Sequence, residues 1–297
     1  MKNHTGSIFD VHQHVLWGGR DIHGLIADLD AHGIAEALLM TWQVGPFEQH
    51  TVEPEFFNSA RVLPDGTHAG LPLSDLLRAL ELYPKRLHLG YCPHPLWPGA
   101  PQMLRSATEM YGVRLCGEWK FTMPLDDPRS LELFKMAGEL GLAVLLHLDV
   151  PYLAGNSKLQ RVWFGGDIEA LERALRACPQ TTFIGHAPGF WRELDADAPT
   201  RAEQYPAGPS TGEGRLPLLM RRHENLYADI SAKSGLVALG RSAAAARQFI
   251  LEFQDRVVFG RDTYGGDHLA FVEPLELPTD VLKKFLWSNA RRLLHLS

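Results

Sequence analysis

The sequence predicts an α/β fold of the (β/α)8 TIM-barrel class, and three observations support it. Eight short β-rich runs recur along the chain with helical patterns between them, which favours a barrel over an open sheet. Several runs are almost continuously hydrophobic, such as Ala143-Val144-Leu145-Leu146, as in parallel strands covered on both faces. The length of 297 residues suits one such barrel, which typically takes ~250 residues. We therefore expect a single domain over residues 1–297.

The expected strands are as long as buried strands, and helices separate most of them. The strands span residues 8–14, 35–41, 87–93, 115–121, 143–149, 181–187, 225–231 and 257–263. The helices span residues 22–32, 74–83, 128–140, 167–177, 243–253 and 279–296. Capping signals mark several ends: Ser74 is predicted as an N-cap, Asp127-Pro128 opens a helix, and Gly33 terminates the first helix.

Two stretches interrupt this alternation. Residues 42–70 follow the second strand, and residues 193–214 follow the sixth and contain a run rich in Gly, Pro and Ser. The second stretch is either a surface excursion or a lid, because the loops after barrel strands surround the active site.

Composition and charge argue against several classes of protein. The chain has 29 Lys and Arg against 35 Asp and Glu, a net charge of −6, which argues against a dedicated nucleic-acid-binding surface. Cys92, Cys116 and Cys178 form no C-x-x-C pair, so neither a disulfide framework nor a cysteine zinc site is supported. No apolar run approaches the ~18–20 residues that cross a bilayer, and no signal-like segment precedes Ile8. We expect a cytoplasmic protein that binds neither nucleic acid nor membrane.

Two histidines close the first strand in the pattern His12-Gln13-His14. Because side chains alternate along a strand, both point the same way, about 7 Å apart along the strand. Two imidazole nitrogens so placed can converge on one ion at about 2.0–2.1 Å each. The pattern alone is a weak signal, since two surface histidines look the same.

Three other strands also end in a side chain that can bind a metal. The fifth run reaches His147, the sixth His186 and the eighth Asp262, and all barrel strands end at one mouth. Neutral imidazole together with carboxylate suits a divalent transition metal, so we expect zinc, with manganese as the alternative. Arg261, beside Asp262, is expected to point away and to form a salt bridge outside the barrel.

The opening Asp10-Val11-His12-Gln13-His14 resembles the first strand of the amidohydrolase superfamily. The chain is similar over nearly its whole length to the amidohydrolase-related branch, including the closing Ser288-Asn289-Ala290-Arg291-Arg292-Leu293-Leu294. That branch includes lactone hydrolases and aminocarboxymuconate-semialdehyde decarboxylase. The resemblance implies a metal-dependent (β/α)8 barrel that either hydrolyses C–N, C–O or related bonds or decarboxylates small acids without oxidation.

The resemblance also assigns roles to individual positions. It implies that His12, His14, His147 and Asp262 ligate the metal. His186 falls on the histidine that polarises the substrate or moves protons beside the metal. Asp262 can also accept a proton from a metal-activated water, so His186 and Asp262 are the expected catalytic residues.

The fourth strand, which ends in Gly117-Glu118-Trp119-Lys120, departs from a simple pattern. Glu118 and Lys120 share a face by alternation, and could form a buried ion pair. Among the relatives that the chain resembles, some place a carboxylated lysine here and others a glutamate, and Gly117-Glu118 resembles the glutamate version. We expect Glu118 either to contact the metal or to pair with Lys120. Lys120 is expected to bind an anionic substrate group, with its carboxylation as the less favoured alternative.

Further candidates lie just beyond the strand ends. Trp17, Trp191 and Tyr264 follow the first, sixth and eighth strands and wall the pocket in this prediction, with ordinary packing as the alternative. Asp149 shares the inward direction of His147 and could orient a ligand or meet the substrate. Asp229 could accept the free N–H of a ligating histidine.

These features favour a metal-dependent hydrolase of a small carboxylate-bearing lactone, ester or amide. The alternative is a metal-dependent, non-oxidative decarboxylase of a small unsaturated or aromatic acid. A metal-binding barrel without catalysis is the third hypothesis. The expected partner is a small, anionic substrate, and a homodimer is possible because relatives are often dimers.

Overall fold

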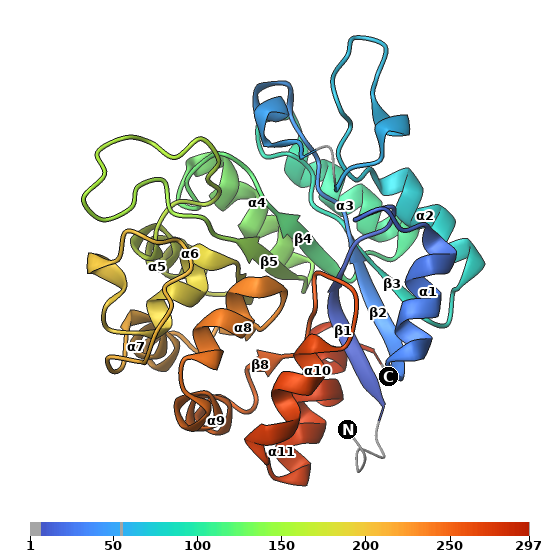
Figure 1. Cartoon of the computed structure of the whole chain (residues 1–297). Helices are drawn as coiled ribbons and strands as arrows, with labels where there is room; N and C mark the ends of the chain where they lie inside the picture. The colour runs from blue at the N-terminus through green and yellow to red at the C-terminus, as the bar shows by residue number, and fades with distance from the viewer. Residues whose placement is uncertain (1–6, 54–55, 297) are drawn as a thin grey trace.

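The computed structural model describes residues 7–53 and 56–296, in which eight parallel strands form one sheet that follows the chain order (Figure 1). The strands are β1 Ile8–Gln13, β2 Ile34–Met40, β3 Leu87–Gly90, β4 Leu115–Trp119, β5 Ala143–His147, β6 Phe183–His186, β7 Leu226–Asp229 and β8 Val257–Val258. Each strand lies within the range that the sequence predicts or begins one residue before it. The fold is a (β/α)8 TIM barrel, and the prediction of the fold class is confirmed.

Hydrogen bonds between the first and last strand regions close the barrel. The backbone N–H of Val11 donates to the carbonyl of Phe259 (3.0 Å), and that of Asp262 donates to the carbonyl of His12 (2.9 Å). The second bond fixes Asp262 beside the His-x-His strand. The eighth strand is much shorter than predicted, and Asp262 already has a positive φ of 48°, so the chain has left the sheet where this carboxylate turns into the mouth.

Helices cover the outside of the sheet (Figure 1). The longer helices are α1 Ile22–Ala31, α2 Leu73–Leu82, α3 Ala100–Tyr111, α4 Pro128–Glu139, α5 Ile168–Ala177, α7 Arg215–Arg222, α8 Ala232–Gly240 and α9 Ala243–Glu252. The shorter ones are α6 Pro188–Trp191, α10 Asp267–Val272, α11 Thr279–Lys283 and α12 Asn289–Leu293, and a π-helical turn over Lys284–Ser288 joins the last two. Short 3₁₀ segments lie at Pro46–Thr51, Ser59–Arg61, Arg192–Leu194, Ala198–Thr200 and Glu273–Leu275.

Some capping predictions are confirmed and others are wrong. The Asp127 side chain accepts from the backbone N–H of Arg129 (2.9 Å) at the start of α4, as expected for an N-cap. Ser74 is not an N-cap, because α2 begins at Leu73 after Pro72. The predicted helix 279–296 is interrupted by the π-helical turn.

The core has two layers, as a covered parallel barrel requires. Inside the barrel, the buried cluster includes Phe9, Leu38, Leu145, Ile184 and Val258. A larger cluster fills the space between the strands and the helices. The inner cluster forms the base on which the polar strand ends rest.

Arg261 forms a fully buried charge bridge from the end of the eighth strand to β1 and α1. Its Nε donates to Asp10 Oδ2 (2.7 Å) and its guanidinium meets Asp28 Oδ2 of α1 at 2.8 Å. Its backbone N–H also donates to Asp10 Oδ1 (3.0 Å). The expected salt bridge is therefore present, and it is fully buried. It holds the strand that carries Asp262 against the strand that carries the His-x-His pattern.

No helix within residues 7–53 and 56–296 is long and apolar enough to span a membrane.

We predict that Arg261→Met destabilises the fold by about 3–5 kcal/mol, because the carboxylates of Asp10 and Asp28 would stay buried without their cation. Urea denaturation followed by circular dichroism measures the change in the free energy of unfolding. The matched control is Arg129→Met, because the Arg129 side chain is exposed and pairs with a partly exposed Asp127; it should cost no more than about 1 kcal/mol. Equal effects of the two substitutions would contradict a structural role for the buried bridge.

Candidate metal centre and active site

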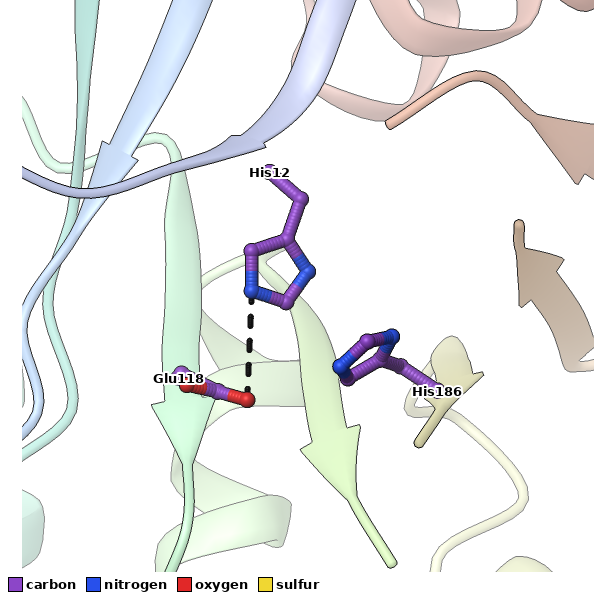
Figure 2. A group of neighbouring side chains, drawn as sticks. All are labelled: His12, Glu118 and His186. Carbon is purple, nitrogen blue, oxygen red and sulfur yellow. Dashed lines mark ion pairs between the residues drawn. The ribbon is translucent and has the colours of Figure 1, made fainter. Parts of the chain in front are cut away.

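Four strand ends bring imidazole and carboxylate groups together at the mouth of the barrel. His12 comes from β1, Glu118 from β4 and His186 from β6, and their side chains point toward one another (Figure 2). Asp262 follows β8, and its Oδ2 lies 3.6 Å from Nε2 of His186. His14, just past β1, joins the same group.

The distances between these atoms match the first coordination shell of one divalent ion. Nε2 of His12 and Nε2 of His14 lie 3.6 and 3.5 Å from Asp262 Oδ1. Glu118 places Oε2 3.4 Å from Nε2 of His14 and Oε1 3.8 Å from Nε2 of His12. Atoms at about 2.1 Å from one tetrahedral ion are about 3.4 Å apart. The donor atoms therefore have the spacing of metal ligands, although these contacts are long for hydrogen bonds.

The buried polar atoms of the cluster support the same conclusion. Among the residues that the structure describes, His12 Nε2, Glu118 Oε2, His186 Nε2 and Asp262 Oδ1 are buried without a hydrogen-bond partner. An unpartnered buried polar group costs free energy, and here all four belong to the same cluster. A divalent cation satisfies nitrogen lone pairs and carboxylate oxygens together, so the residues present fit such an ion.

The opposite nitrogen of each of these histidines is held by a fixed partner. Nδ1 of His14 donates to the carbonyl of Met40 (2.9 Å), which sets the tautomer because a carbonyl only accepts. Nδ1 of His12 lies 2.7 Å from Asp229 Oδ2, and Nδ1 of His186 lies 2.8 Å from the hydroxyl of Ser231. Asp229 thus lies where it can accept the N–H of His12, as expected from the sequence. Such contacts orient the rings and leave Nε2 for the centre.

The structure places His147 at the edge of this cluster rather than in its middle. Its Nδ1 lies 2.7 Å from Glu118 Oε1, and its Nε2 lies 3.1 Å from Asp149 Oδ2. Burial and the charge of Lys120 lower the pKa of His147, but Asp149 and Glu118 raise it further, so the net shift is upward. Both ring nitrogens of His147 therefore face carboxylates, and its role as a metal ligand stays a prediction.

The charges of the cluster shift its pKa values in opposite directions. Burial lowers the pKa of His12, but the surrounding carboxylates, Asp262 foremost, raise it to about 9. Burial opposes ionisation of Asp262, yet the charge of His12 holds its pKa well below the usual range. The pKa of Glu118 is also low despite burial, chiefly through the charge of Lys120. Burial and the nearby charge of His12 lower the pKa of His186, so its ring is neutral at pH 7.

A cavity of about 530 Å³ opens above the cluster. Its wall includes Lys120, His147, His186, Asp262 and an aromatic set made up of Trp17, Trp42, Phe56, Phe164, Tyr205 and Tyr264. Nζ of Lys120 lies 4.0 Å from the ring centre of Trp42, where a cation is attracted to the π face. Within the described residues no ion pair joins Lys120 to Glu118; Glu118 instead meets His14 and His147. Lys120 is thus a cation in the cavity wall.

The stretch 193–214 reaches the cavity through Gln204 and Tyr205. Nε2 of Gln204 donates to Asp149 Oδ1 (2.7 Å), the carboxylate that also meets His147. Arg241 anchors the base of the stretch through Asp197 Oδ2 (2.8 Å). This stretch therefore contributes to the wall of the cavity, as a lid would, rather than forming only a surface excursion.

One expected candidate for the pocket wall lies elsewhere. The prediction that Trp191 lines the pocket is wrong: its ring is fully buried, its Nε1 donates to the carbonyl of Asp229 (2.8 Å), and it packs on Phe249. The reason is that α6 turns the chain behind the strand ends directly after His186. Trp17 and Tyr264 do line the cavity.

Sequence reasoning missed Ser231 and most of the aromatic wall. Ser231 could have been found from the pattern Asp229-Ile230-Ser231 at the seventh strand end, because alternation gives both polar side chains the same direction. Trp42 and Phe164 lie in long loops, where no periodic signal places a side chain.

Comparisons with known proteins identify the family and the fold. A family model described as amidohydrolase matches residues 102–296. 5-Carboxyvanillate decarboxylase from Sphingomonas paucimobilis is 14% identical, with a TM-score of 0.62 over 98% of this chain and 99% of that one. A putative 2-pyrone-4,6-dicarboxylic acid hydrolase from Pseudomonas putida is 17% identical, with a TM-score of 0.59 over 97% of each chain.

A third solved structure, dihydroxybenzoic acid decarboxylase from Polaromonas sp. JS666, contains manganese and the inhibitor 2-nitroresorcinol. It is 15% identical, with a TM-score of 0.62 over 98% of this chain and 97% of that one. No curated protein matches the sequence. The structural similarities establish the shared barrel, and the family model covers most of the strands and helices that build the site. The chain therefore belongs to the amidohydrolase family.

Proposed function

We propose that this protein is a metal-dependent hydrolase of a small, carboxylate-bearing lactone, ester or amide. The observation that carries the proposal is the set of unpartnered imidazole and carboxylate atoms facing one another below a cavity with a cationic wall. His12, His14 and Asp262 would hold the ion, and Glu118 supplies a further oxygen. We propose zinc, with manganese as the alternative. When bound, such an ion polarises a carbonyl and makes water nucleophilic near neutral pH.

His186 and Asp262 handle the proton in this proposal. Nε2 of His186 faces Asp262 Oδ2 across 3.6 Å, and the lowered pKa of His186 keeps its ring neutral. The pair accepts the proton of the attacking water, and His186 returns it to the leaving group. The imidazolium formed meanwhile stabilises the negative charge that develops on the substrate oxygen.

Lys120 and the aromatic wall recognise the substrate in this proposal. The ammonium group supplies the positive charge for a substrate carboxylate, and it is held in place over Trp42. The rings of Trp17 and Phe56 are stacked with centres 5.0 Å apart and leave a flat apolar surface. A small planar acid matches both features.

A decarboxylase is the second candidate, and His147 favours it. Protonation of an unsaturated or aromatic carbon before loss of CO₂ needs a proton donor, and His147 has a raised pKa and lines the cavity. Two of the three solved structures described above are decarboxylases by name. The same cation and aromatic wall would hold an aromatic acid.

Assays of a panel of lactones, amides and hydroxybenzoate-type acids separate the two candidates. Acid release and CO₂ are followed in parallel, with zinc- and manganese-loaded protein. The proposal predicts acid release that a chelator stops and metal restores. Reproducible CO₂ release without hydrolysis would contradict the hydrolase proposal and support the decarboxylase.

We predict that His14→Ala and Asp262→Ala lose at least nine-tenths of the bound metal, because each removes a donor atom from the cluster. Metal per chain is measured by inductively coupled plasma mass spectrometry after dialysis against zinc and then buffer. His295→Ala, at an exposed position, is the control and should bind as the wild type does. Full metal content in Asp262→Ala would contradict the assigned site.

Metal uptake should release a proton and strengthen with pH. The pKa of His12 is raised to about 9 in the metal-free protein, so at pH 7 an ion must displace the proton on its ring. Zinc affinity should therefore rise about tenfold per pH unit between pH 6 and 8. Titration calorimetry in buffers of different ionisation enthalpy counts the protons. A pH-independent affinity with no proton release would disagree with this electrostatic picture.

Lys120→Met should raise KM at least tenfold for an anionic substrate while changing kcat less, because the lost charge acts on binding. Steady-state kinetics on the active substrate from the panel measures both constants. Lys135→Met on the exposed face of α4 is the control. An unchanged KM would remove Lys120 from substrate recognition.

A further inference from the structure

We propose that Ser231 is a positioning residue whose hydroxyl fixes the tautomer of His186. The geometry assigns the single ring proton of neutral His186 to Nδ1, and this leaves the Nε2 lone pair facing Asp262. The catalytic consequence rests on the proposed function, whereas the tautomer does not.

The hydroxyl of Ser231 lies at the centre of a fully buried network. Its Oγ is 2.8 Å from Nδ1 of His186, 3.1 Å from Nδ1 of His12 and 2.5 Å from Asp229 Oδ2. All four residues have no exposed surface. Water therefore cannot replace a missing partner, and each proton in the network must lie between a donor and an acceptor within it.

Asp229 accepts at both carboxylate oxygens. Its Oδ1 accepts the backbone N–H of Ser231 (3.0 Å), and its Oδ2 lies 2.7 Å from Nδ1 of His12. An oxygen-to-oxygen contact of 2.5 Å between Ser231 and Asp229 requires a proton between them, since two bare oxygens would repel. The hydroxyl proton of Ser231 therefore points to Asp229.

This assignment leaves Ser231 Oγ only as an acceptor toward His186. A hydroxyl has one proton, so the bond to His186 must use a proton on Nδ1. The ring then carries no proton on Nε2 in its neutral form. Nε2 of His186 has no hydrogen-bond partner among the described residues, so no acceptor within hydrogen-bond distance holds a proton on that nitrogen.

The side chain of Ser231 does not cap the helix that follows it. Ser231 occupies the N-cap position of α8, where serine normally accepts from the backbone of the first turn. Its side chain makes no such bond. The hydroxyl instead faces back to the strand ends, so the usual reason for a serine at this position is absent.

Ser231→Ala removes the acceptor for Nδ1 of His186 and creates a buried, unpartnered N–H. The ring lowers this cost by moving its proton to Nε2, where it faces the carboxylate of Asp262. His186 then presents a proton in place of a lone pair, and it cannot accept one from the attacking water. His12 keeps its bond to Asp229, so the metal ligands remain.

The experiment is nitrogen NMR on ¹⁵N-histidine-labelled protein, metal-free and zinc-loaded, with the His186 signals assigned from a His186→Gln spectrum. The wild type should show His186 as the Nδ1–H tautomer, and Ser231→Ala should show the Nε2–H tautomer. Ser231→Thr keeps the hydroxyl and should keep the Nδ1–H tautomer. Ser234→Ala is the matched control, because Ser234 is a buried serine three residues away whose hydroxyl donates to a backbone carbonyl.

Kinetics supply the second readout. Ser231→Ala should lower kcat about 10–100-fold, with KM and zinc per chain within twofold of the wild type, and Ser231→Thr should restore most of kcat. An Nδ1–H tautomer in Ser231→Ala, or the Nε2–H tautomer in the folded wild type or Ser231→Thr, would overturn the proposal. An unchanged kcat with the altered tautomer would overturn the catalytic consequence. The NMR measurement needs no substrate. It therefore tests the tautomer of His186 even if the protein is not a hydrolase.

Discussion

The burial of two like charges beside one another is the constraint on which the rest of the structure depends. Glu118 and Asp262 both reach the mouth of the barrel, and the charge of Glu118 opposes ionisation of Asp262. Both nevertheless have lowered pKa values, because imidazoles and an ammonium group surround them. Buried carboxylates need such compensation, and a divalent cation would complete it where the imidazole and carboxylate atoms face one another without partners.

The surrounding structure holds those groups in place. Arg261 ties the end of the eighth strand to Asp10 on β1 and to Asp28 on α1, so the elements that carry Asp262 and His12 cannot separate without exposing a buried charge. Asp229 and Ser231 orient the two rings from behind. The site is therefore rigid on the barrel side and is built from loops on the cavity side, where substrate identity is decided.

Much of the fold could be predicted from the sequence because buried parallel strands have a simple pattern. The apolar runs of β5 and β6 end at His147 and His186, and the structure places both beside the centre. Helix α3 gave a weak signal, since its buried residues are only Ala100, Leu104 and Ala107. The predicted end of the eighth strand was wrong because pairing with the first strand is set by tertiary contacts that no local pattern records.

The candidate site was predictable at strand ends and not in loops. Position along a strand located His12, Glu118 and Asp262, but the hydrogen bonds that engage both nitrogens of His147 depend on how neighbouring strands are staggered. The prediction for Trp191 was wrong because α6, directly after β6, turns its side chain away from the cavity and packs it on Phe249. Gln204 and Tyr205 reach the cavity through a folded loop, whose path depends on ion pairs such as Arg241 with Asp197.

The central claim is that one divalent ion occupies the space among His12, His14 and Asp262. Crystals of zinc-loaded protein measured on both sides of the zinc absorption edge test it most directly. We expect an anomalous peak within about 2.0–2.2 Å of Nε2 of His12 and of a carboxylate oxygen of Asp262. A well-ordered site without an anomalous peak, with His12 Nε2 donating directly to Glu118 or Asp262, would contradict it.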